Sequence, residues 1–89
     1  MNSIRFMQGE QRYLEFEIIP RRQNDAVVIT AASWELLQNG AAVDGGACEV
    51  DGRAIRALIA PAGPGVYQLE LAATVPPETR KERLMLYVD

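Results

Sequence analysis

The stretch between Pro61 and Leu71 constrains the fold more than any other part of this chain. Proline and glycine dominate residues 61–65. Apolar residues then alternate with polar ones, at Tyr67, Leu69 and Leu71. A cluster of proline and glycine marks a turn, and alternation with a period of two is typical of a strand with one buried face. The stretch therefore predicts a turn that leads into a half-buried β-strand.

The rest of the chain divides into similar short segments separated by turn residues. Extended segments are expected at residues 3–7, 11–19, 27–38, 41–43, 47–50, 53–60, 65–75 and 78–88. Asn39-Gly40 and Asp51-Gly52 are two-residue hairpin signals, because these residue types tolerate a positive φ. Loops are expected at residues 21–25 and at Asp44-Gly45-Gly46. Seven to eight short strands with turn signals about every 8–12 residues predict an all-β fold, an immunoglobulin-like antiparallel β-sandwich.

Two segments leave an alternative open. Residues 78–86 contain fair helix formers, so a helix there competes with a closing strand. The terminal Leu-Met-Leu-Tyr-Val sequence favours a strand that pairs with the strand of Tyr67. Leu58 breaks the alternation of its segment, which predicts a strand that is either buried on both faces or bulged.

Composition indicates the class of protein. The 89 residues form one expected domain, residues 1–89, in which 48% of the residues are hydrophobic. The net charge is −3 and the basic residues are scattered, so we expect neither a nucleic-acid binder nor a protein of anionic membrane surfaces. A single cysteine and a start without an apolar core of a signal peptide favour a cytoplasmic protein.

The residues that usually carry catalysis are scarce. The chain has no histidine, the commonest general base and metal ligand. Its two serines, Ser3 and Ser33, lie outside any nucleophile-elbow motif. Glu15 and Glu17 share one face of a predicted strand, where a solvated surface is the simpler interpretation than a two-carboxylate site. We therefore expect no enzyme, no catalytic residue and no cofactor.

Cysteine and acidic residues are also expected to be structural. Cys48 has only acidic neighbours in the sequence, and a reactive thiol needs a cation nearby, so we expect a small buried residue. Asp44, Glu49 and Asp51 do not have the spacing of a calcium-binding loop, and aspartate beside glycine is normal turn chemistry. No metal site is expected.

Three aromatic residues and three basic residues are the main candidates for contacts. Trp34 shares the parity of its apolar neighbours, which predicts a core position. Tyr67 is expected in a tyrosine corner or the core, and Tyr13 is expected to be exposed. Arg80, Lys81 and Arg83 lie on the closing segment, where their charges would either protect a sheet edge or form a recognition edge for a partner strand. The candidate partner-binding residues are thus Tyr13, Arg80, Lys81 and Arg83.

The order of these segments resembles that of a known group of proteins. The resemblance rests on residues 9–18, 32–36, Asn39-Gly40, 46–52 and 65–71, followed by a charged closing strand. This arrangement is similar to small immunoglobulin-like structural and accessory proteins of tailed phages and prophages. The resemblance implies a non-enzymatic protein that stays in the cytoplasm until it is assembled into a virion.

What the resemblance implies about partners is also specific. Such a protein would bind other virion or assembly proteins through its sheet edges and loops, and it could also associate with itself through an edge strand. The alternative from a different class is a carbohydrate- or cell-surface-binding immunoglobulin-like module. That function needs exposed aromatic residues on a sheet face or a loop rim.

Overall fold

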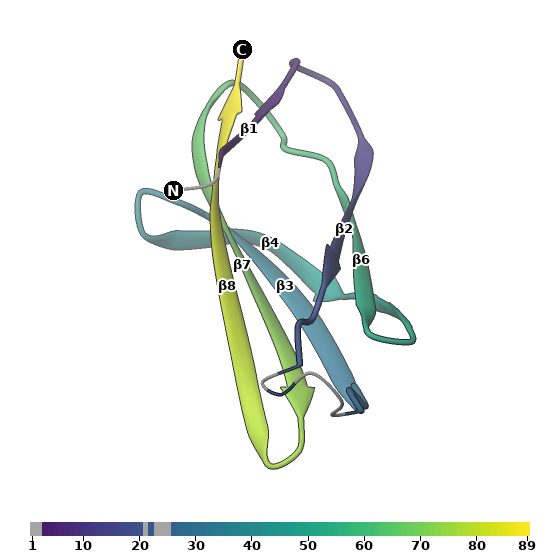
Figure 1. Cartoon of the computed structure of the whole chain (residues 1–89). Coiled ribbons are helices and arrows are strands. Elements are labelled where there is room, and N and C mark those ends of the chain that lie inside the picture. The colour runs from purple at the N-terminus through teal and green to yellow at the C-terminus, as the bar shows by residue number, and fades with distance from the viewer. Residues whose placement is uncertain (1–2, 21, 23–25) are drawn as a thin grey trace.

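The protein is an all-β sandwich in the part that its structure describes, residues 3–20, 22 and 26–89 of a computed structural model (Figure 1). Eight strands make up its regular structure: β1 (Ser3–Phe6), β2 (Arg12–Glu17), β3 (Ala31–Gln38), β4 (Ala41–Ala47), β5 (Glu49–Asp51), β6 (Ala54–Ile59), β7 (Gly65–Val75) and β8 (Glu78–Val88). The predicted fold class, a β-sandwich of seven to eight strands, is confirmed. Most of the expected loop at residues 21–25 lies outside the described residues.

The strands form two sheets. The first sheet has five strands in the order β1-β8-β7-β3-β4, and the second has three in the order β2-β6-β5. All pairs are antiparallel except β1 and β8, which run parallel where Ser3 to Phe6 lie beside Met85 to Val88. Figure 1 shows the two sheets facing each other, with the long hairpin of β7 and β8 extending beyond the smaller sheet. The smaller sheet therefore covers only part of the larger one.

The core lies between the two sheets and follows the alternation of the strands. Side chains at every second position point inward, because successive residues of a strand face opposite sides of its sheet. The buried hydrophobic residues are Phe6, Leu14, Ile18, Leu36, Ile55, Ala57, Ile59, Tyr67, Leu69, Leu71, Ala73, Leu84, Leu86 and Val88. The strand predicted after Pro61 is β7, and it lies in the middle of the larger sheet.

Residues 78–88 form strand β8 and not the alternative helix. Leu84, Leu86 and Val88 are buried on one face of the strand. β8 pairs along its whole length with β7, from Glu78 opposite Val75 to Val88 opposite Gly65. Burial and cross-strand pairing here override the helix propensity of the charged first half of the segment.

The strand of Leu58 was predicted wrongly. Leu58 is 38% exposed, so β6 is not buried on both faces. The register between β2 and β6 is continuous, with Leu58 directly opposite Tyr13, so β6 is not bulged. The apolar run in β6 thus comes from one leucine on the outer face of the smaller sheet.

The segment Asp44-Gly45-Gly46 was also predicted wrongly, because it is part of strand β4 and not a turn. It pairs with Leu36, Glu35 and Trp34 of β3. A Cβ atom on Gly45 would lie 3.1 Å from the carbonyl oxygen of Trp34, and one on Gly46 would lie 3.3 Å from the indole nitrogen of Trp34. These two glycines are therefore explained by close approach to β3.

Candidate functional site

Two edge strands have only exposed residues, the seven-residue β4 of the larger sheet and the three-residue β5 of the smaller one. Among the described residues no strand pairs with the outer side of β4. Asp44 is its one charged residue, and the Asp44 carboxylate accepts a hydrogen bond of 2.8 Å from the N–H of Gly45. The register shift between Leu36 and Leu37 leaves Val43 as the extra residue of a β-bulge. β4 thus presents a nearly uncharged backbone edge to solvent.

A row of four residues crosses the outer face of the larger sheet and ends at β4. Arg83 of β8 lies opposite Glu70 of β7, Glu70 lies opposite Glu35 of β3, and Glu35 lies opposite Gly45. Arg83 forms an ion pair of 3.6 Å with Glu70. Glu35 forms no ion pair with any residue that the structure describes. The row therefore reads cation, anion, anion and then a position without a side chain.

A depression lies along this row. Its volume is about 410 Å³, and Ser33, Ala72 and Gly45 line it together with the charged residues Glu35 and Glu70. Small side chains on three adjacent strands leave this part of the sheet surface uncovered. Lys81 of β8 stands at the side away from β4. An extended side chain that enters from the β4 edge would meet Glu35 first.

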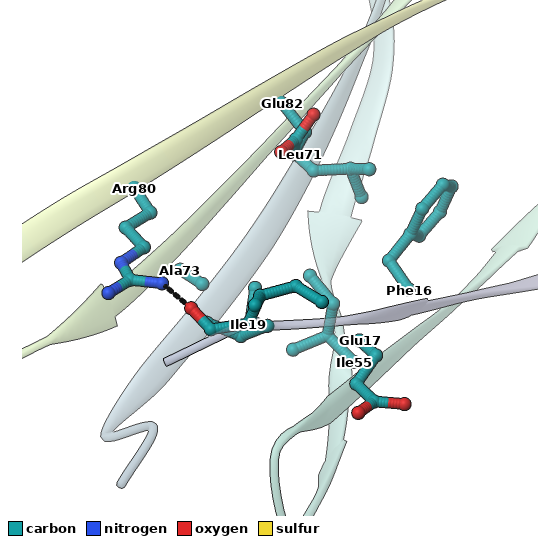
Figure 2. Close-up of a pocket in the computed structure, with 9 residues that line it drawn as sticks. Phe16, Glu17, Ile19, Ile55, Leu71, Ala73, Arg80 and Glu82 are labelled. Atoms are coloured by element: carbon teal, nitrogen blue, oxygen red, sulfur yellow. Dashed lines mark hydrogen bonds between the residues drawn. The ribbon is translucent and has the colours of Figure 1, made fainter. Parts of the chain in front are cut away.

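A second hollow is the cleft between the two sheets, beside the uncovered part of β8. Its volume is about 260 Å³, and apolar side chains of both sheets line it, among them Phe16, Ile55 and Leu71 (Figure 2). The guanidinium of Arg80 reaches across the cleft and donates a hydrogen bond to the backbone carbonyl of Ile19, as the dashed line in Figure 2 shows. Arg80 thus connects β8 to the segment that follows β2.

The three basic residues proposed on the closing segment do not share one face. Arg80 and Glu82 line the cleft between the sheets, whereas Lys81 lines the outer depression. Arg83 reaches Glu70 on that same outer face. The alternation of β8 turns Arg80 toward the cleft and leaves Lys81 and Arg83 on the outer face, so the three residues do not act as one group. Charged side chains that point inward on an edge strand hinder the addition of another strand.

Tyr13 lies on the opposite side of the sandwich from Lys81 and Arg83. It is 51% exposed on the outer face of the smaller sheet, as predicted for the exposed aromatic residue. The guanidinium of Arg56 stacks 4.3 Å from the centre of the Tyr13 ring and forms an ion pair of 2.8 Å with Glu49. The structure therefore does not bring the four candidate partner-binding residues together.

The remaining candidates are explained by packing. Tyr67 is buried, as expected for a corner or core tyrosine, and its hydroxyl donates a hydrogen bond of 2.9 Å to the backbone carbonyl of Gly63. Trp34 packs against the core but is only half-buried, because β4 beside it carries glycine. Cys48 is half-buried where the chain passes from one sheet to the other, and burial raises the pKa of its thiol.

The described residues contain neither a metal-binding cluster nor a helix that could cross a membrane. No group of three or more histidine, cysteine, aspartate or glutamate residues in the described ranges is arranged to hold a metal ion. Within the same ranges, no helix has the length and hydropathy to cross a membrane.

Comparison with known proteins gives a structural likeness and no match in sequence. No family model matches the chain, and no curated protein matches it in sequence. Among solved structures, the chain is similar to an engineered protein whose crystal structure was determined by a structural genomics consortium. The TM-score is 0.77 at 16% identity, over 99% of this chain and 18% of that protein. At this identity the likeness supports the fold alone.

Proposed function

We propose that the protein is a non-enzymatic protein-binding module that takes a strand of its partner onto the β4 edge. The observation that carries this proposal is the exposure of all seven residues of β4, with a single charged side chain among them. An exposed edge offers unpaired N–H and C=O groups to an extended peptide, which is a recurring mode of peptide recognition. Natural sheets blunt an edge without a partner by charges or β-bulges. β4 has one of each, Asp44 opposite the buried Leu36 and the bulge at Val43, so its seven residues carry a single charge.

The contrast with β8 supports the choice of β4. Over residues 79–84 no described strand pairs with the outer side of β8. That part of β8 carries four charged residues in six positions, with Arg80 and Glu82 facing the cleft. This is the pattern of a protected edge. In our proposal, the basic residues of β8 therefore protect that edge from pairing with another strand, and the β4 edge binds the partner.

The sandwich is of the immunoglobulin-like type in this proposal. Its first strand lies beside its last, and the larger sheet faces a smaller sheet of β2, β6 and β5. The hydrogen bond from Tyr67 to Gly63 has the position of the tyrosine corner of such domains. Immunoglobulin-like sandwiches serve many functions, so the fold alone does not select a partner.

Virion and assembly proteins are the partners to test first. The reason is the resemblance of the segment order to the immunoglobulin-like proteins of tailed phages and prophages. In this proposal the protein is made in the cytoplasm and joins a particle through its partner.

A capture experiment with two matched variants tests the proposed function. The tagged protein is mixed with a lysate of the source organism after prophage induction, and the retained proteins are identified by mass spectrometry. Val43→Lys places a charge on the β4 edge, and Leu58→Lys places the same charge on the outer face of the other sheet. Both residues are exposed, so both variants should fold, as circular dichroism can verify.

The two outcomes are distinct. We expect the wild type and the L58K variant to retain a capsid, neck or tail protein, and the V43K variant to lose it. Equal retention by both variants would contradict the β4 edge as the binding site. Retention of no protein from a lysate that contains particles would contradict the virion role.

A further inference from the structure

The charge row on the larger sheet specifies one residue of the partner. We infer that the strand added at β4 carries a lysine or arginine opposite Gly45, and that this cation pairs with Glu35. This inference rests on the proposed strand addition at β4, and it goes beyond it by naming the chemistry of the partner. It follows from the register of four strands, from an unpaired carboxylate and from the depression beside it.

Of the two facing glutamates, only Glu70 forms an ion pair among the described residues, although Lys81 lines the same depression. Glu35 and Glu70 lie directly opposite each other on β3 and β7, and like charges in that position destabilise a sheet. Arg83 pairs with Glu70 on the side away from Glu35. Glu35 is therefore left with an anion on one side and Gly45 on the other. A cation beyond Gly45 would complete an alternation of charge along the row.

The geometry lets a long side chain reach Glu35 over Gly45. Neighbouring strands lie about 4.8 Å apart, so the backbone of an added strand would lie roughly 10 Å from the backbone of β3. Gly45 has no side chain to block the path between them. Lysine and arginine carry their charge at the end of a long apolar stem that can lie along a surface. The depression of about 410 Å³ at Gly45 and Glu35 provides the space for that stem.

A second copy of this chain that pairs through its own β4 does not supply the cation. Pairing of β4 with β4 would place a β4 residue opposite Gly45, and β4 contains only alanine, valine, aspartate and glycine. The open part of β8 is basic, but its inward-facing charges hinder strand pairing, so we infer that the partner is a different protein with an extended basic segment. The net charge of −3 on this protein favours such a partner over long distances.

Selection from a library of random linear peptides tests the inference without knowledge of the natural partner. Peptides are selected on the wild type and then measured for binding to four variants. Val43→Lys tests the edge, and Leu58→Lys is its matched control. Glu35→Gln tests the charge, and Glu15→Gln is its control, since Glu15 is an exposed glutamate of the other sheet.

We expect the selected peptides to contain a basic residue. They should bind the L58K variant as they bind the wild type, and they should not bind the V43K variant. The E35Q variant should bind them about two- to fivefold more weakly, the scale of one exposed ion pair, whereas E15Q should bind as the wild type does. Glu35→Lys should recover binding when the basic residue of the peptide is exchanged for glutamate. This recovery is specific for a direct charge contact, because a general loss of stability in the protein would not be reversed by a change in the peptide.

Two different failures can be told apart. Peptides that depend on the β4 edge but show no basic residue and no response to E35Q would overturn the inference and leave strand addition at β4 intact. Peptides that bind V43K as well as the wild type, or a selection that yields no binder, would overturn strand addition itself and the inference with it.

Discussion

Tyr67 shows how one side chain fixes the entry to the central hairpin. The residue is buried, and its hydroxyl is bonded to the carbonyl of Gly63 at the turn before β7. Tyr67→Phe keeps the ring in the core but leaves that carbonyl without its donor, so we expect a loss of about 1–2 kcal/mol in the free energy of unfolding. Tyr87→Phe is the matched control, since Tyr87 is 38% exposed, and should change stability by less than about 0.5 kcal/mol. Urea unfolding measures both, and equal losses would contradict the tyrosine corner.

Cys48 gives a prediction about pH. Burial raises the pKa of its thiol, because a partly desolvated site disfavours the thiolate. The neutral thiol is thus favoured by folding, and this contribution to stability is fully present below the unfolded thiol pKa. It declines as the pH rises from that value through the higher folded pKa. Alkylation by iodoacetamide against pH should show a higher midpoint for the folded protein than in guanidinium, and a lower folded midpoint would contradict the burial.

At the scale of single strands, neighbouring residues of β6 lie on opposite faces of the smaller sheet and differ in burial. Ile59 is fully buried, while Leu58 beside it is 38% exposed. We expect Ile59→Ala to lower the free energy of unfolding by about 2–5 kcal/mol, since it leaves a cavity in the core. Leu58→Ala should lower it by less than about 1 kcal/mol. Similar losses for both variants, measured by chemical denaturation, would mean that Leu58 is buried in solution.

The facing carboxylates of Glu35 on β3 and Glu70 on β7 predict a substitution that raises the free energy of unfolding. Glu35→Gln removes the repulsion from Glu70, so it should raise the free energy of unfolding by about 0.2–1 kcal/mol. The gain should shrink in high salt, which screens exposed charges. Glu49→Gln, which breaks the ion pair with Arg56, should lower stability instead. Thermal unfolding at low and high salt measures both, and destabilisation by E35Q would show that Glu35 has a stabilising role in the free protein.

Turn residues and alternating apolar residues in the sequence predicted the elements whose conformation depends mainly on their own residues. The Asn39-Gly40 hairpin is one, with φ angles of 54° and 80°, and the alternation before and after Pro76-Pro77 is another. Strand β4 could not be predicted in this way. Gly45-Gly46 is a turn signal in the sequence, and only the approach of Trp34 from the neighbouring strand explains these glycines within a strand.

At the scale of the whole molecule, the number and pattern of short strands predicted the sandwich but not its edges. Which strand lies at an edge depends on the pairing order, and that order places β4 at one end of the larger sheet. The sequence therefore predicted contacts at the charged residues of β8, whereas only the three-dimensional structure shows that β4 is an exposed and nearly uncharged edge. The same holds for the row from Arg83 to Gly45, whose members come from four different strands.

The most direct test of the β4 edge is amide hydrogen exchange of the protein alone and with its captured partner. Strand addition at β4 predicts new protection of amides in residues 41–47 on binding, with little change at residues 79–84, because a ladder shields the N–H groups that it pairs. Protection confined to residues 79–84 or to β2, with β4 exchanging as in the free protein, would contradict the central claim that β4 is the recognition edge.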